Sequence, residues 1–213
     1  MLMIMADFAL HLQQRTSKSR IMTDYRHLSQ DDILKLKAVV LYIVDKCGET
    51  DCFHIFKILY FADREHYAVY GRRIVNDTFH AMKNGPVPSA LYNAIKDVTG
   101  KEPLPVYSKL KTISSALREA DSMYDHYICA VEKPDMDELS ASDIEMLDKS
   151  IAANLPRTFG ELSGKSHDEA WMAAFRKKPN SKIDPLLMAK AGGASDDTLD
   201  FIKEMETINS LAY

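Results

Sequence analysis

Apolar residues along this chain recur mainly at the three- and four-residue spacings of α-helices. The first such run follows Ser29 and Asp32, which have the spacing of a helix-capping box, and it comprises Ile33, Leu36, Val40, Ile43 and Val44. Gly48 follows the run, and glycine is the commonest residue just beyond a helix end. The pattern therefore predicts a first helix between Ser29 and Gly48.

The segment from Phe53 to His66 is apolar almost all round and becomes polar only at its end. Such a segment predicts a helix in the middle of the fold, with its far end near water. Beyond it, Asn76-Asp77 is a candidate two-residue turn and Thr78–Met82 a short extended run. Proline fixes φ at positions 86 and 88, and Gly85 can adopt a conformation closed to other residues, so we expect a rigid loop that starts the next helix.

Later segments continue the helical pattern with one interruption. Apolar residues between Leu91 and Val98 predict a helix closed by Gly100, whereas residues 108–120 fit either a helix or an extended segment. Tyr127–Val131 is β-branched and aromatic, which predicts a strand paired with Thr78–Met82. Three capping signals predict further helices after Ser140 (Ile144, Leu147 and Ile151 inward), at Thr158–Glu161 and at Ser166–Glu169. Pro179 and Pro185 are expected to interrupt the helical pattern in the segment that follows.

A final amphipathic helix is predicted to start at Ser195 or Asp196, after a flexible joint at Gly192-Gly193. Its apolar stripe comprises Leu199, Ile202, Met205 and Ile208. The stripe can pack on the body or serve another chain, including a homo-oligomer formed through residues 195–211, and both alternatives stay open.

These elements indicate a mainly α (α+β) fold: a compact helical domain with a small antiparallel β-sheet, plus a C-terminal helix. We expect an N-terminal arm at residues 1–28, the main domain at 29–178 and a C-terminal extension at 179–213. A chain of 213 residues can bury a good core without disulfides or metals.

Composition narrows the class of protein. The chain is 46% hydrophobic and 27% charged, which is typical of a soluble globular protein, and it has no apolar run long enough to span a membrane. Three unpatterned cysteines (Cys47, Cys52, Cys129) favour a reducing compartment, so we expect a cytoplasmic protein. With a net charge of −4 and no helix-turn-helix extension, DNA binding ranks low.

Acidic residues cluster in two segments, 132–148 and 196–206. They are either solvated helix faces or an acidic surface that complements a basic partner.

Three ordered blocks of residues resemble the Panacea domain, also called the SocA-like antitoxin domain. The first is Lys57–Asp63, His66, Tyr70-Gly71-Arg72 and Ala81-Met82-Lys83 running into Gly85-Pro86-Val87-Pro88. The second is Pro134-Asp135 with Leu139–Glu145 and Leu147-Asp148, and the third is Glu161-Leu162-Ser163, Ser166-His167 and Trp171. Together the blocks span residues 30–175.

The resemblance implies a small bacterial or phage-associated protein, and many members of the family are the antitoxin half of a toxin–antitoxin pair. It implies a protein-binding domain that needs no chemistry and no cofactor, with a cognate toxin as partner. The acidic segments would fit a basic toxin. Two alternatives also follow from the family: an adaptor that delivers a partner to protease machinery, or a phage-related regulator.

The central helix supplies a candidate partner-contact patch. Lys57, Tyr60, Arg64 and Tyr67 share one helical face, where Lys and Tyr can cover apolar surface and keep a polar tip in water. The patch also takes in Asp63, His66, Lys83, Gly85, Pro86 and Pro88. The alternative is that Gly85–Pro88 only turns the chain.

Candidate chemistry is sparse. Asp63 and His66 lie three residues apart and can share a proton or a metal ion, which leaves a metal-dependent hydrolase as a remote alternative. Nearby His and Cys residues lack the spacing of a metal site, so we expect no metal and no enzyme activity. His167 and Trp171, four residues apart, are interpreted as a packing unit rather than a stacking platform.

Overall fold

The computed structural model describes residues 25–121 and 126–211, so most of the expected N-terminal arm lies outside the described residues. The helices are α2 (Gln30–Cys47), α3 (Cys52–Tyr70), α4 (Ser89–Val98), α5 (Lys111–Ser114), the 3₁₀ turn η1 (Met136–Glu138), α6 (Ala141–Asn154), α7 (Phe159–Ser166), α8 (Glu169–Lys177), α9 (Pro185–Ala191) and α10 (Asp196–Leu211). The strands are β1 (Thr50–Asp51), β2 (Phe79–Met82), β3 (Gly85–Pro88), β4 (Leu117–Glu119) and β5 (Tyr127–Ala130). The predicted mainly α fold with a small antiparallel β component is confirmed.

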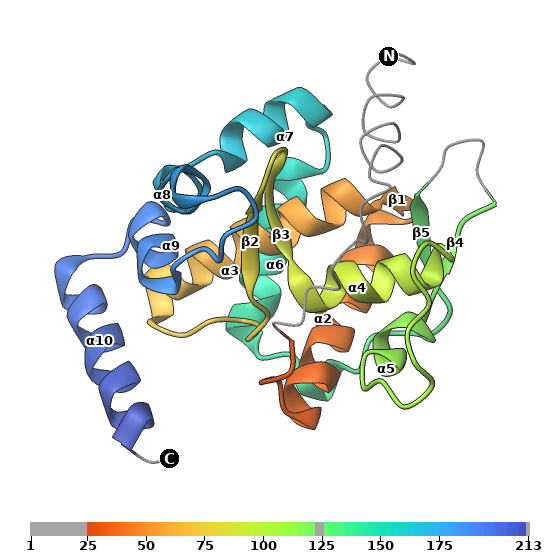
Figure 1. The fold of residues 1–213 in the computed structure, drawn as a ribbon, viewed down its shortest axis with the longest axis horizontal. Helices are drawn as coiled ribbons and strands as arrows, with labels where there is room; N and C mark the ends of the chain where they lie inside the picture. The colour runs from red at the N-terminus through yellow and green to blue at the C-terminus, as the bar shows by residue number, and fades with distance from the viewer. Residues whose placement is uncertain (1–24, 122–125, 212–213) are drawn as a thin grey trace.

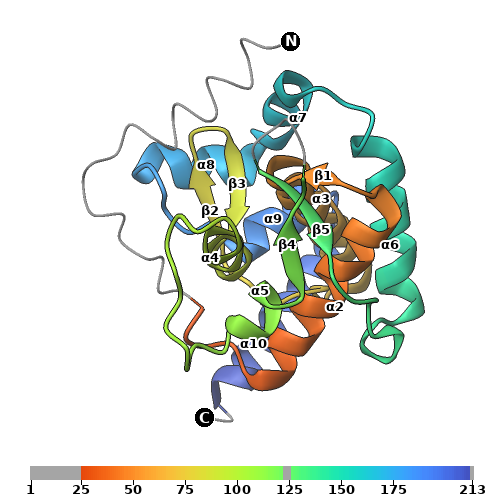
Figure 2. The same ribbon diagram turned by 90° about the vertical axis from the view of Figure 1, so that its right-hand side faces the viewer.

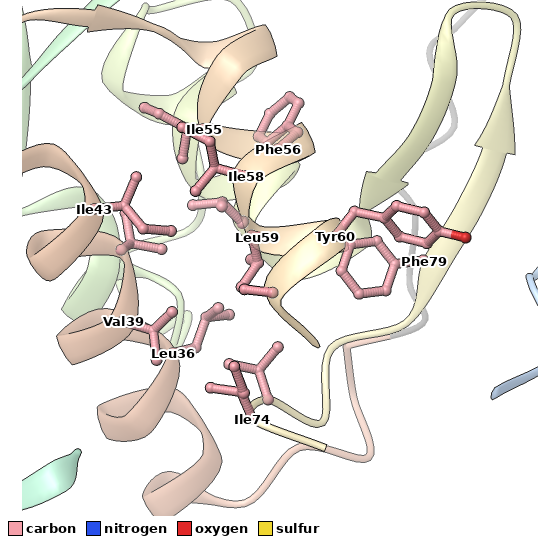
Figure 3. Close-up of a cluster of buried hydrophobic side chains, with 14 of the residues drawn as sticks. Leu36, Val39, Ile43, Ile55, Phe56, Ile58, Leu59, Tyr60, Ile74 and Phe79 are labelled. Carbon is pink, nitrogen blue, oxygen red and sulfur yellow. The ribbon is translucent and has the colours of Figure 1, made fainter. Parts of the chain in front are cut away.

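Helix α3 lies in the middle of the molecule, as its nearly continuous apolar sequence predicts (Figure 1). It contacts α2, α6, α7, α9 and β3. Its side chains Ile55, Ile58 and Leu59 are fully buried and meet Val39 and Ile43 of α2 in the core (Figure 3). Because neighbours pack on several sides of α3, polar residues such as Lys57 and Asp63 are buried together with its apolar ones.

Most helix starts agree with the capping signals in the sequence. Ser29, Ser140 and Thr158 each accept a hydrogen bond from the backbone N–H three residues on, and the acidic residue at that position bonds back to form a capping box. The signal at Ser166 is wrong, because Asp168 caps α8 instead. Local spacing alone does not distinguish two polar residues that lie two positions apart.

The predicted strand pairing is wrong. β2 pairs with β3, and the tight turn is Lys83-Asn84 rather than Asn76-Asp77. The expected Gly85–Pro88 loop is thus a strand, and α4 starts directly after it. β5 pairs instead with β1 and β4 in a separate three-stranded sheet that contacts α2 (Figure 2). β2 and β3 follow each other along the chain, so their pairing closes only a short loop. A short loop loses less conformational entropy on closure than the long loop that pairing with β5 would require.

The segment between α8 and α9 adds a second set of backbone hydrogen bonds to the hairpin, along the outer edge of β2. The backbone N–H of Ala81 donates to Ser181 O (2.8 Å), and that of Ile183 donates to Phe79 O (2.8 Å). Helix α9 then packs against α3 and α8. Pro185 does not interrupt a helix but begins one. It occupies the first turn of α9, directly after the capping residue Asp184. Residues 180–191 are thus built into the body of the domain.

Helix α4 takes its N-terminal cap from outside its own sequence neighbourhood. The buried carboxylate of Asp77 accepts hydrogen bonds from Ala90 N (2.9 Å), Leu91 N (3.1 Å) and Ser89 Oγ (3.1 Å). The residue directly before the helix, Pro88, provides no side-chain cap. Asp77 therefore ties the chain entering β2 to the helix leaving β3, and it satisfies donors that would otherwise be buried unpaired.

Replacing Asp77 by alanine is expected to destabilise the protein by about 2 kcal/mol, because three buried donors lose their acceptor at once. The matched control is Asp184→Ala, which removes the exposed local cap of α9 and is expected to cost about 1 kcal/mol. Urea unfolding at pH 7 measures both values. Equal losses for the two variants would contradict the role given to Asp77.

Candidate partner-binding region at helix α3 and the β2–β3 hairpin

The polar residues predicted for a contact patch on α3 lie mostly inside the protein. Lys57, Tyr60, Asp63 and His66 are fully buried, and Tyr67 is only 6% exposed. The expectation that Lys57 and Tyr60 keep their polar tips in water is therefore wrong, because both side chains are fully buried among the elements that pack on α3. Buried polar groups must find hydrogen-bond partners within the protein.

Lys57 reaches the hairpin from the first half of α3. Its ammonium donates a hydrogen bond to Pro86 O of β3 (2.8 Å) and lies 4.7 Å from the centre of the Phe53 ring. Burial lowers the pKa of Lys57 to about 7. Lys57 thus joins the helix to the hairpin while it carries only part of its usual charge at neutral pH.

Gly85 makes this close approach possible. Its φ is +103°, a conformation that side chains rarely adopt, and a Cβ at this position would lie 2.9 Å from Lys57 Nζ and closer still to Ser166 Oγ. The start of β3, the end of α7 and the Lys57 side chain therefore meet at one point. Only glycine leaves enough space for all three.

Tyr60 and Arg64 connect α3 to the start of α8. Both donate to Asp168 Oδ2, at 2.8 Å and 2.9 Å, while Asp168 Oδ1 accepts from Trp171 N as the helix cap. The Tyr60 ring packs edge-on against Phe79 of β2 (Figure 3). Burial, with the neighbouring Asp168 carboxylate, raises the pKa of Tyr60 well above its usual value. The phenol therefore stays a hydrogen-bond donor.

Trp171 holds the hairpin from the α8 side. Its indole N–H donates to Met82 O (2.9 Å), and its ring stacks between His167 (3.7 Å between centroids) and Phe175 (4.6 Å). Burial lowers the pKa of His167, so a neutral imidazole takes part in the stack. The hairpin is thus fixed on one side by α3 and on the other by α8.

Asp63 is engaged with the chain that follows α3. Arg73 Nε donates to Asp63 Oδ2 (2.8 Å), and Ile74 N donates to Oδ1 (2.6 Å). Asp63 therefore serves to turn the chain after α3 back onto the core.

His66 has a different set of partners. It contacts Arg72 O through Nδ1 (2.8 Å) and Ser142 Oγ through Nε2 (3.1 Å). A carbonyl only accepts, so Nδ1 carries the proton, and burial lowers the pKa of His66. His66 Nε2 also lies 3.3 Å from Asp143 Oδ1, so Asp63 and His66 are bound to separate groups.

The exposed part of the predicted patch is small. Lys83, at the hairpin turn, is exposed, and Arg64 is partly exposed, whereas Gly85, Pro86 and Pro88 are buried. A direct partner contact by these residues stays a prediction. Sequence reasoning missed Asp168, which lies about a hundred residues from Tyr60 and Arg64 along the chain, because no spacing pattern links positions so far apart.

Metal-binding clusters and membrane-spanning helices are both absent from the described residues. Within residues 25–121 and 126–211, no group of three or more His, Cys, Asp or Glu side chains is arranged to hold a metal ion. None of the helices in this described part of the chain has both the length and the apolar character needed to cross a bilayer.

Gly85→Ala is expected to destabilise the protein by about 2 kcal/mol or more, because the new methyl group needs an unfavourable backbone conformation and displaces Lys57 and Ser166. The control is Gly164→Ala in α7, where a Cβ meets nothing within 4 Å and the free energy of unfolding should rise by about 0.5 kcal/mol. Thermal and urea unfolding measure both. A neutral Gly85→Ala substitution would contradict the close approach.

Lys57→Met is expected to change how stability depends on pH. Unfolded Lys57 keeps its proton up to the usual pKa of 10.5, whereas folded Lys57 releases it from about pH 7 upward. Between these values the unfolded state binds the extra proton, so the free energy of unfolding should rise with pH by about 1 kcal/mol per unit in the wild type relative to the variant. The exposed control Lys83→Met should follow the wild type in urea unfolding at pH 7, 8 and 9. Parallel profiles for wild type and Lys57→Met would contradict a lowered pKa.

A protein-family model matches the central part of the chain. The family model described as "Antitoxin SocA-like, Panacea domain" matches residues 55–172, more than half of the chain. Neither a curated protein nor a solved structure matches. The matched segment runs from α3 through the hairpin and α6 to the start of α8, and it contains Lys57, Gly85 and Asp168. The chain therefore belongs to the SocA-like antitoxin family of Panacea domains.

Proposed function

We propose that this protein is a cytoplasmic antitoxin that binds a cognate toxin protein and blocks it by forming a stable complex. The family match over residues 55–172 is the observation that supports this role. A blocking protein needs a firmly shaped surface and no reaction chemistry. Interfaces of stable complexes bury about 800 Å² on each partner, which a domain of this size can readily supply.

The interior described above would give such a surface its shape. Lys57, Tyr60 and Trp171 fix the β2–β3 hairpin between α3 and α8, so that the turn with Lys83 is held in one position. A preorganised surface loses little conformational entropy on binding, which favours tight complexes. In this proposal the buried residues position the contact surface, and exposed residues such as Lys83 touch the toxin.

The test uses the gene next to the one that encodes this chain. Its product expressed alone should arrest growth, co-expression with this protein should restore growth, and the two proteins should elute together in gel filtration. Absence of arrest, or absence of rescue, would contradict the proposal. Rescue accompanied by loss of the partner, with no accumulating complex, would instead indicate delivery to a protease.

A variant separates binding from catalysis in the same assay. Ser142→Ala removes the hydroxyl group beside His66, and the variant should still rescue growth because complex formation requires no reaction. Loss of rescue by a folded Ser142→Ala protein would favour an enzymatic role over the proposed one.

A further inference from the structure

Helix α10 carries two apolar stripes, of which one is buried against the domain and the other is largely exposed. Ile202 is 1% exposed and, with the partly buried Leu199, packs against the core. Phe201, Met205 and Ile208 are 48%, 39% and 51% exposed. Their spacing of four and three residues places them along one side of the helix, so together they form a continuous outer stripe.

The helix that carries the outer stripe is anchored to the domain. α10 contacts α9 and the end of α3, and it lies at the edge of the molecule (Figure 1). The Phe201 ring lies so close to Gly71 that a Cβ there would be 2.7 Å from Phe201 Cδ1. The outer stripe is therefore presented in a defined orientation and not on a free tail.

An acidic stripe runs beside the outer apolar stripe. Asp197, Asp200 and Glu204 are all exposed, and at 100° per residue they fall on the flank next to Phe201 and Ile208. The one basic residue between 196 and 211 is Lys203, whose ammonium is paired with Asp200 (2.8 Å). The outer face of α10 thus combines an apolar stripe with negative charge along one edge.

We propose that the outer face of α10 docks a basic amphipathic helix of the toxin. This inference rests on the antitoxin role proposed above and names the chemistry of the partner. The apolar side of the incoming helix would cover Phe201, Met205 and Ile208. Its Lys or Arg residues would lie along Asp197, Asp200 and Glu204, where opposite charges speed association and fix the register.

Charge also argues against a second copy of this chain as the occupant. In a symmetric antiparallel helix pair each flank lies beside the same flank of the other copy. The acidic stripe would then face an identical acidic stripe, and like charges at such contacts oppose pairing. A partner of opposite charge avoids this repulsion.

Two variants and a matched control test the proposal on the full chain. Met205→Ser with Ile208→Ser removes apolar surface but keeps Phe201, which packs on Gly71. Asp197→Asn, Asp200→Asn and Glu204→Gln together neutralise the acidic stripe. The control is Val106→Ser with Tyr107→Ser, since both side chains are 92% exposed and belong to a different surface loop. Circular dichroism verifies that each variant is folded.

Affinity for the purified product of the neighbouring gene should fall at least tenfold in the serine variant of α10 and stay unchanged in the control. Neutralising the acidic stripe should lower the association rate constant and make that rate constant depend less on salt concentration. Unchanged binding by both α10 variants overturns the proposal. A wild-type dimer that the serine variant converts to a monomer also overturns it, because the occupant is then a second copy.

A peptide measurement keeps this test independent of the antitoxin role. Two designed amphipathic peptides of about 20 residues, long enough to form helices, share one apolar face and carry either Lys or Glu along its edge. The wild-type chain should bind the Lys peptide at least tenfold more tightly than the Glu peptide, and the serine variant should lose this preference. Equal binding, or binding of neither peptide, contradicts the inference even where the neighbouring protein is a toxin. Preferential binding of the Lys peptide with no toxic neighbour contradicts only the antitoxin role.

Discussion

The fold depends on the need to satisfy polar side chains on a helix that neighbouring elements bury along most of its length. Lys57, Tyr60, Asp63 and His66 follow one another at three-residue steps along α3, and all four are fully buried. Three residues turn a helix by 300°, so successive side chains point about 60° apart. Each one consequently meets a different segment: β3, the cap of α8, the chain after α3, and α6. One helix thereby fixes the positions of four distant parts of the chain.

This arrangement separates the residues that shape the domain from those that can touch a partner. A buried polar network contributes less to stability than apolar packing of equal volume, but an unsatisfied member costs several kcal/mol, so alternative arrangements are strongly disfavoured. The hairpin and α8 are therefore held in one geometry by contacts such as Lys57 with Pro86 and Tyr60 with Asp168. A protein that acts by occupying a partner's surface benefits from such rigidity, because little freedom is lost when the complex forms.

Local patterns in the sequence predicted the helices well and the long-range contacts poorly. Capping boxes at Ser29, Ser140 and Thr158 join residues only three positions apart, so the sequence alone predicts them. The structure confirms all three. The cap that Asp77 gives to α4 and the pairing of β5 with β1 join residues that are distant along the chain, and no short pattern encodes them. Within the candidate site, helical spacing placed the α3 residues on shared faces, but it did not reveal that neighbouring elements cover those faces.

The hydrogen bonds between β2 and residues 180–183 show that the folded unit extends beyond the segment that matches the family model. The part of the chain recognisable as a family ends at residue 172, but the hairpin at its centre is completed by backbone that arrives only at residues 180–183. A chain cut at residue 172 would leave the outer edge of β2 without these backbone partners, and unpaired strand edges favour aggregation. A shortened chain that keeps the hairpin protected must therefore extend at least to Ile183.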